Sequence, residues 1–355
     1  MKILVLAKRR PQGRDLLRHP FGRFYHLPAY LASKGHEVTV CLLDYKNTGK
    51  AVVQRNNIEW ISLNFMPGTF IGFYLALKKQ VKHSRPDWII GCSDSWYGVM
   101  AQRLATKYAC RSLIDAYDDF ESYIRWLKPL HYLWRKSLRK ADVVTAAGPQ
   151  LLEKMSLQRD IVQRKYILPM SADEQFYPRD RQDSRQAIEL PLTRKLIGYC
   201  GSISTTRNMH EIFHAVEKVR QVHHDVTLVL SGRCEKGIKL PDFVIYKGYL
   251  EDSQVPLFIN AMDVMVSWLK PGLFAESSYP VKIYEALACQ RPIVARDTIP
   301  CRWILQDDRN FLAANENELA EKLSRHLERD IAMTMLPHSW NETAAKIDDI
   351  ICDRI

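Results

Sequence analysis

The segment GSISTTRN, residues 201–208, has the composition of a loop that binds phosphate groups. Gly201, together with the small residues Ser202 and Ser204, would let backbone N–H groups approach an anion closely. Arg207 adds a positive charge just before a predicted helix. An arginine in that place is also often a solvated side chain without a ligand. The segment alone leaves both interpretations open.

A second basic residue stands in SSYPVKIYEALAC, residues 277–289. Lys282 and Glu285 lie one turn apart on a predicted helix, so an intrahelical ion pair worth roughly 0.2–0.5 kcal/mol would account for them. The alternative is that Lys282 meets an anion while Glu285 accepts hydrogen bonds from two adjacent hydroxyl groups. The loop before the helix would then add contacts through the hydroxyls and backbone amides of Ser277, Ser278 and Tyr279.

Three aspartates gather where a predicted strand ends in LIDAYDDFESY, residues 113–123. α/β domains display catalytic groups at such strand-to-loop junctions, which makes Asp118 and Asp119 candidates alongside Asp115. Capping and turn formation by aspartate is the equal alternative. The sequence does not separate Asp118 from Asp119.

Two further segments are rich in basic residues. Arg9, Arg10, Arg14 and Arg23 surround Gly22, and they either meet an anion or form a solvated loop. Residues 123–140, YIRWLKPLHYLWRKSLRK, mix aromatic and basic side chains, as in a segment that rests on an anionic bilayer. Their helical spacing favours a helix that packs on a sheet instead.

These candidates need strands and helices to position them. Apolar runs at 2–7, 37–42, 88–91, 112–115 and 143–146 predict parallel strands joined by helices. The pattern restarts at IGYCG (197–201), MHEIFHAVEKVRQV (209–222) and VTLVLSG (226–232), which predicts a second domain. We therefore expect an α/β protein with two Rossmann-like, doubly wound parallel-sheet domains facing across a cleft. The polar segment 178–191 is the expected linker.

Length and charge agree with this organisation. The 355 residues exceed what one hydrophobic core usually supports. The net charge of +11 suits a phosphate-bearing ligand, an anionic membrane or a nucleic acid, but no nucleic-acid motif appears and the basic residues are dispersed. The N-terminus reads as a strand rather than a signal peptide, and no apolar run is long enough to span a membrane. Eight scattered cysteines without a metal-ligand spacing favour a reduced, cytoplasmic location.

The order of several segments resembles the retaining glycosyltransferases of family 4, the glycosyl transferases group 1, over nearly the whole chain. The most specific segment is SSYPVKIYEALACQRPIVA, residues 277–295, which resembles the donor-binding helix of that family. Glu285 matches the second of its two glutamates, whereas Ser277 takes the place of the first. Weaker matches, in the right order, are GRFYHLPAYLASKGHEVTV, RKADVVTAAGPQLLEKM, YILPMSADEQFYP and SWNETAAKIDDII.

The resemblance implies a GT-B fold with an N-terminal acceptor-side domain at 1–180, a donor-binding domain at 190–337 and a final helix, 338–355, that packs back on the first domain. It implies that Arg207 and Lys282 neutralise the diphosphate of a nucleotide sugar and that Glu285 recognises the ribose. Gly22 would let the first domain close over the phosphates, and backbone groups near Tyr249 would contact the base. Asp118 or Asp119 would touch the donor sugar or orient the acceptor hydroxyl.

The activity implied is transfer of a sugar, with retention, from a nucleotide-sugar donor to a glycan or lipid-linked acceptor in bacterial surface-polysaccharide synthesis. We expect no metal and no cofactor, because the sequence contains no Asp-x-Asp motif and basic side chains can stabilise the leaving group. We expect a cytoplasmic protein that binds no nucleic acid, with peripheral contact to the inner face of an anionic membrane as an open option. The alternatives are a noncatalytic nucleotide-sugar-binding homologue and a sugar-nucleotide epimerase of the same fold.

Overall fold

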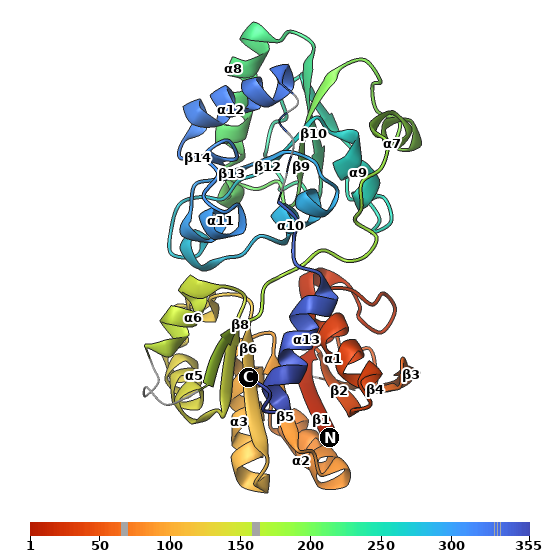
Figure 1. Ribbon diagram of the computed structural model, residues 1–355, viewed down its shortest axis with the longest axis vertical. Coiled ribbons are helices and arrows are strands. Elements are labelled where there is room, and N and C mark those ends of the chain that lie inside the picture. The colour runs from red at the N-terminus through yellow and green to blue at the C-terminus, as the bar shows by residue number, and fades with distance from the viewer. Residues whose placement is uncertain (65–69, 158–163, 330, 332, 334) are drawn as a thin grey trace. The chain divides into compact units, whose positions relative to one another are not determined.

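The computed structural model describes residues 1–64, 70–157, 164–329, 331, 333 and 335–355, which form two compact units (Figure 1). Unit 1 comprises Met1–Met170 and His338–Ile355, and unit 2 comprises Ser171–Pro337. Residues 171–180, which we expected in the first domain, belong to unit 2. The reason is hydrogen bonding to unit 2, because Arg179 N donates to Asn260 Oδ1 at 2.9 Å and Asn260 Nδ2 donates to Tyr177 O at 3.0 Å.

Unit 1 is built on an eight-stranded sheet with the order β3-β4-β2-β1-β5-β6-β7-β8, in which β3 alone is antiparallel to its neighbour. The strand order reverses between β1 and β5, so the loops that follow these two strands flank the switch point of unit 1. The strands are β1 (Lys2–Lys8), β2 (Glu37–Asp44), β3 (Ala51–Arg55), β4 (Ile58–Asn64), β5 (Trp88–Cys92), β6 (Arg111–Ala116), β7 (Val143–Ala146) and β8 (Arg164–Ile167).

Both faces of this sheet are covered, which explains why its strands are almost uniformly apolar. Ile3 and Val5 of β1 pack under α1 (Arg23–Ser33) and α13 (Trp340–Ile351). Leu4 and Leu6 pack on the opposite face under α2 (Phe70–Ser84) and α3 (Ser95–Tyr108). Three more helices complete the unit: α4 (Phe120–Tyr123), α5 (Lys128–Lys140), which packs against α3, and α6 (Pro149–Ser156).

Unit 2 contains a six-stranded parallel sheet with the order β11-β10-β9-β12-β13-β14. Its strands are β9 (Lys195–Cys200), β10 (Val226–Ser231), β11 (Val244–Tyr246), β12 (Val264–Ser267), β13 (Ile293–Arg296) and β14 (Leu312–Ala313). Its helices are α7 (Arg181–Ala187), α8 (Met209–Val222), α9 (Val255–Ala261), α10 (Val281–Ala288), α11 (Ile299–Ile304) and α12 (Glu316–Glu328). Here the order reverses between β9 and β12. The expected α/β class with two doubly wound parallel sheets is confirmed.

The segment that we expected to be a linker is instead part of unit 2. Asp180 caps α7 by accepting a hydrogen bond from Asp183 N at 2.9 Å, and the helix packs against α9. Arg185 is buried and donates to Asp263 Oδ2 at 2.7 Å. The polar composition of residues 178–191 was misleading, because Arg181 and Arg185 pair with Asp263, which lies far along the chain.

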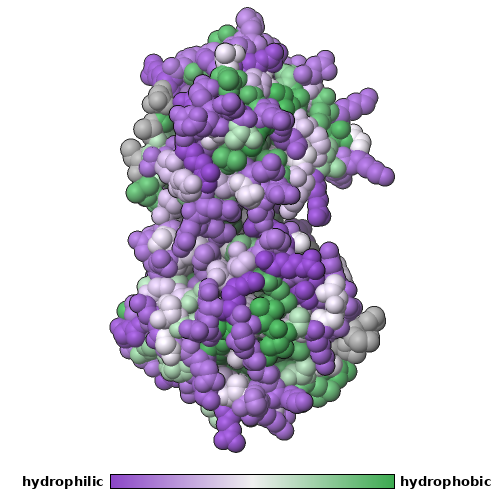
Figure 2. All heavy atoms as spheres, turned by 90° about the vertical axis from the view of Figure 1, so that its right-hand side faces the viewer, coloured by the Kyte–Doolittle hydropathy of each residue, from purple (hydrophilic) through white to green (hydrophobic). Residues whose placement is uncertain are grey.

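The surface of the molecule is mostly hydrophilic in the view of Figure 2, although hydrophobic residues gather in a patch on unit 1. Among the helices that the structure describes, none combines the length and the apolar character needed to cross a bilayer.

Candidate functional site

The switch point of unit 2 brings together two of the segments singled out in the sequence. The loop after β9 carries Gly201 and leads through a short 3₁₀ turn that ends at Arg207. The loop after β12 leads to α10, which carries Lys282. Because ligands of open parallel sheets bind beyond the strand ends at such a point, this is the candidate site of unit 2.

Lys282 lies directly over Gly201. Its Cε atom is 3.2 Å from the point where a Cβ would stand on Gly201, and the Tyr199 hydroxyl is equally close to that point. The Tyr199 hydroxyl also donates to the carbonyl of Ser202 at 3.0 Å. Gly201 therefore lets α10 and the β9 loop approach each other, so that the Lys282 side chain reaches the end of the central strand.

The charges at this point favour an anion. Burial by itself lowers the pKa of Lys282, but attraction to the Cys200 sulfur, the Glu285 carboxylate and the Tyr199 hydroxyl outweighs it and raises the pKa above its usual value. Arg207 lies near enough to oppose that rise. Burial raises the pKa of Tyr199, although Arg207 and Lys282 both favour its ionised form. Two cations thus meet at one strand end, and Glu285 shares their surroundings.

A second glycine at this edge was missed from the sequence. Gly232 follows β10 with φ +135°, and a Cβ there would stand 1.8 Å from the carbonyl oxygen of Gly201. Gly201 N donates to Ser231 O and Gly232 N to Gly248 O, both at 2.8 Å. The loops after β9, β10 and β11 are therefore joined backbone to backbone. The SG pair at the end of the predicted strand 226–232 was the available signal.

The remaining predicted residues of unit 2 lie around these loops. Ser202 is exposed, and the Ser204 hydroxyl contacts Thr206 at 2.9 Å. Tyr249 is 61% exposed, with the Arg233 guanidinium 5.6 Å from its ring centre. Before α10 the chain is buried at three consecutive residues, Ser277, Ser278 and Tyr279. The Tyr279 ring packs edge-on against Trp303 at 5.6 Å.

Another charged group at the same end of the sheet was not predicted. Glu211 Oε2, in the first turn of α8, accepts from Trp268 Nε1 at 2.7 Å and from Arg296 at 2.6 Å. Arg296 also lies over the Trp268 ring at 4.7 Å. These contacts tie α8 to the ends of β12 and β13. They join residues 57 and 85 positions apart, which no local pattern reveals.

In unit 1, Asp118 and Asp119 line a small cavity of about 140 Å³ between α5 and α6. Asp119 is 3% exposed, and its carboxylate accepts from Lys154 Nζ at 2.5 Å. Asp118 is more exposed. Asp119 pairs with Lys154 and Asp118 is the less buried of the two, and both border the cavity.

The basic loop of unit 1 differs from our expectation, because most of its arginines are engaged in ion pairs. Arg9 is 7% exposed and donates to Asp15 and Asp44. Arg10 pairs with the same two aspartates. Arg23 is 3% exposed and forms a two-point ion pair with Asp115 at 2.6 and 2.7 Å. These three side chains form ion pairs within unit 1, which contradicts the solvated-loop alternative for them.

Two other residues of that loop have different settings. Gly22 precedes α1 with φ +62°, which favours glycine, and nothing stands within 4 Å of its absent Cβ. The Arg14 guanidinium stacks 3.7 Å from the centre of the Phe21 ring. Gly22 therefore leaves open space beside the backbone at the start of α1.

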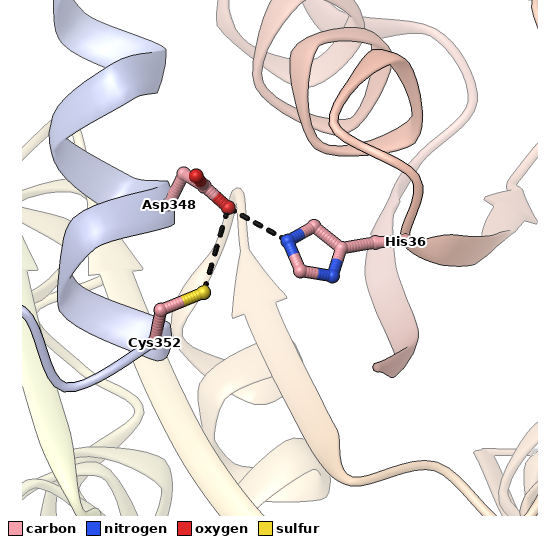
Figure 3. A group of neighbouring side chains, drawn as sticks. All are labelled: His36, Asp348 and Cys352. Carbon is pink, nitrogen blue, oxygen red and sulfur yellow. Dashed lines mark hydrogen bonds and ion pairs between the residues drawn. The ribbon is translucent and has the colours of Figure 1, made fainter.

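One group among the described residues has the ligand types and spacing of a metal centre (Figure 3). His36 Nε2 lies 2.7 Å from Asp348 Oδ1, and Cys352 Sγ lies 3.8 Å from the same oxygen. However, the other Asp348 oxygen pairs with Arg354. The positive charge of this guanidinium beside the group disfavours a cation. We interpret the group as an ion-pair cluster that fixes α13 to unit 1.

Two family models match the chain, and they fall one on each unit. Residues 23–167 match the glycosyl transferase 4-like domain, and residues 194–329 match the glycosyl transferases group 1 domain. No curated protein sequence matches the chain significantly.

Several solved structures share the fold. Sucrose-phosphate synthase from Thermosynechococcus elongatus is 15% identical with a TM-score of 0.74, covering 99% of this chain and 98% of its own. HepE from Anabaena, in complex with UDP, is 16% identical with a TM-score of 0.72, covering 99% and 95%. A putative UDP-N-acetylglucosamine 2-epimerase from Listeria monocytogenes is 14% identical with a TM-score of 0.66, covering 99% and 96%.

The fold is therefore GT-B, as we expected. Together with this fold, the two family matches support a glycosyltransferase of the GT-B type. The match to the glycosyl transferase 4-like domain lies in unit 1. The match to the glycosyl transferases group 1 lies in unit 2, which contains the site at the ends of β9 and β12.

Proposed function

We propose that the protein transfers a sugar, with retention and without a metal ion, from a nucleotide-sugar donor to a glycan or lipid-linked acceptor. The observation that carries the proposal is the position of Lys282 over Gly201, beside Arg207, at the switch point of unit 2. The diphosphate of a leaving nucleotide gains negative charge as the sugar departs, and preorganised cations stabilise that charge. A raised pKa keeps Lys282 protonated for this role.

Other residues of unit 2 would orient the donor. Glu285 lies on the same helix as Lys282, where its carboxylate would accept hydrogen bonds from the two ribose hydroxyls. The loop amides after β9, with Ser202 and Ser204, would contact the phosphates. Ser277, Ser278 and Tyr279 would meet the sugar or its phosphate. Tyr249, exposed beside the β11 loop, would border the base.

The reaction needs no compulsory protein base. The acceptor oxygen would form its bond to the anomeric carbon on the face from which the phosphate oxygen leaves. A phosphate oxygen of the departing nucleoside diphosphate would take the acceptor proton. Asp118 or Asp119, in unit 1, would orient the acceptor hydroxyl, and Gly22 would give the phosphates room at the start of α1. We assign the reaction to polysaccharide synthesis in the cytoplasm, at the inner face of the membrane, and no cofactor takes part.

Donor hydrolysis tests this proposal. Purified protein is incubated with a panel of nucleotide sugars, and the release of nucleoside diphosphate is compared between wild type, Arg207→Ala and Glu285→Ala. Lys218→Ala, which alters an exposed lysine that pairs with Glu316, is the matched control. Loss of turnover in the first two variants alone supports the site. Undiminished turnover in both refutes it. Turnover that persists in chelator supports a metal-independent reaction.

The epimerase alternative has a specific basis, since the Listeria monocytogenes structure that shares the fold is that of a putative UDP-N-acetylglucosamine 2-epimerase. Proton NMR of the reaction distinguishes the two activities. An epimerase interconverts nucleotide sugars without releasing the nucleotide, whereas a transferase releases nucleoside diphosphate and yields a product whose anomeric configuration shows retention. A noncatalytic homologue, which the serine at position 277 suggests, would bind the donor and convert none.

A further inference from the structure

One face of unit 1 carries mostly positive charge, although Arg135 of α5 pairs there with Glu121 of α4. The helices α2, α3 and α5 lie on the same side of the sheet, and none of the three contains an acidic residue. By contrast, α13, on the opposite face, contains Glu342, Asp348 and Asp349. The basic side chains of the three helices, which we call the basic face, are Lys78, Lys79, Lys82, Arg103, Lys107, Lys128, Arg135, Lys136, Arg139 and Lys140.

The helix α5 divides sharply between a packed side and an exposed side. Its buried side includes Trp134, which contacts α3 where Gly98 leaves room, since a Cβ on Gly98 would stand 2.6 Å from the Trp134 ring. The buried side of α5 is therefore accounted for by its packing within unit 1. The opposite side presents a stripe at a spacing of four residues, all of them exposed: Lys128, Tyr132, Lys136 and Lys140.

Large apolar side chains are exposed within and beside the basic face. Trp126, just before α5, is 78% exposed, and Tyr132 is 61% exposed. On α2, Ile71 and Leu75 lie one turn apart and are 70% and 53% exposed. Aromatic and aliphatic side chains that stand among lysines and arginines are typical of surfaces that lie in the interface of an anionic bilayer. Nucleic acid would match the charge but not the exposed aliphatic pair.

We propose that the basic face docks unit 1 onto an anionic lipid bilayer. The lysines and arginines attract the acidic headgroups, while Trp126, Tyr132, Ile71 and Leu75 insert into the boundary between headgroups and acyl chains. The cavity with Asp118 shares Trp134, Arg135 and Leu138 with α5. Docking would therefore hold this cavity close to the membrane surface, where a lipid-linked acceptor is presented. Only that last step rests on the proposed function.

Vesicle sedimentation with the full chain tests the proposal. Vesicles of phosphatidylcholine alone are compared with vesicles that also contain phosphatidylglycerol, at low and high salt. The test variant is Lys136→Glu/Lys140→Glu. Its matched control is Lys236→Glu/Lys239→Glu, two exposed lysines in the loop after β10. We expect binding to the anionic vesicles only, weakened by salt and by at least about 25-fold in the test variant, since each interfacial lysine contributes about fivefold.

Three outcomes would overturn the proposal: equal binding to both vesicle types, equal losses in the two double variants, or preferential binding of duplex DNA or single-stranded RNA that the test variant abolishes. Tyr132→Ser, which keeps every charge, should weaken vesicle binding and leave the salt dependence in place. Donor hydrolysis without vesicles is measured in parallel. It should be unchanged in both double variants, so that failure of membrane docking is distinguished from failure of the transferase assignment.

Discussion

The carbonyl oxygen of Gly201 lies 1.8 Å from the point where a Cβ atom would stand on Gly232. No side chain can be placed there without moving the backbone of one of the two loops. The contact fixes the loop after β9 against the loop after β10, and so it fixes the backbone beneath Lys282. The proposed phosphate site is therefore built on two glycines that lie on neighbouring strands.

Gly232→Ala should strongly destabilise unit 2. The new Cβ meets the Gly201 backbone, and φ +135° is itself unfavourable for alanine, so we expect a loss of about 3 kcal/mol or more in the free energy of unfolding. Gly237→Ala is the matched control, because φ is +90° and nothing stands within 4 Å. It should cost about 1 kcal/mol. Equal losses in chemical denaturation would contradict the steric argument.

Lys282→Met should weaken the binding of a nucleoside diphosphate by roughly 10- to 100-fold, the usual range for losing a charge-assisted hydrogen bond. Arg207→Met should have a similar effect, because both cations would contact the same diphosphate in the proposed site. Calorimetric titration with a panel of nucleoside diphosphates measures both. Lys218→Met, on the exposed side of α8, should leave the affinity unchanged. Unaltered affinity in both site variants would show that the phosphate does not bind at this position.

The same affinity should depend little on pH in the alkaline range. The pKa of Lys282 lies above its usual value, so the ammonium is present below that value and is lost only as the pH rises through the still higher pKa of the folded protein. We expect a flat affinity from about pH 7 to about pH 9. Lys282→Arg, which stays charged throughout, is the reference. A tenfold fall in wild type but not in the arginine variant would show that the pKa is not raised.

Asp115→Asn should destabilise unit 1 by about 3–5 kcal/mol, because it leaves the Arg23 guanidinium buried without its counter-charge. The side chains of this pair are 2% and 0% exposed. The control is Glu321→Gln, which breaks an ion pair with Arg325 in which both side chains are 57% exposed. That change should cost less than about 0.5 kcal/mol. Thermal unfolding separates the two, and equal shifts would argue against a buried pair.

The attachment of α13 should weaken in acid. Burial acts to raise the pKa of Asp348, but hydrogen bonds from His36 and Arg354 prevail and leave it below 3.8. A lowered pKa means that the contribution to stability is present above that value and is lost as the pH falls through the folded pKa. Asp348→Asn should therefore increase hydrogen exchange in α13 at neutral pH. Asp349→Asn, on the more exposed neighbour, should change it much less, and equal exchange would contradict the role of the cluster.

The sequence predicted those elements whose signals are local. The predicted helix at 209–222 coincides with α8, because its apolar residues recur at helical spacing, and the strands before and after it were found from their apolar runs. The antiparallel pair β3 and β4 was missed, although Asn56 and Asn57 both adopt positive φ at its turn. Two adjacent asparagines between short strands were a usable signal.

Long-range partners explain the other errors. Arg23 reads as one of several basic residues in a loop, yet it pairs with Asp115, 92 positions away. Arg185 reads as part of a polar linker, yet it pairs with Asp263. In both cases the burial of the charge depends on contacts that composition and spacing do not encode. The cations around Gly201 were found because motif and strand end coincide there.

The path of the chain has a consequence for how the protein folds as it is made. Ala344, Ile347, Ile350 and Ile351 of α13 belong to the same core as β1 and α1, although the whole of unit 2 lies between them in the sequence. All of unit 2 is therefore synthesised before unit 1 can complete its apolar core. Until α13 is synthesised, part of one face of the sheet in unit 1 is uncovered, and the nascent chain exposes an apolar surface that chaperones would bind.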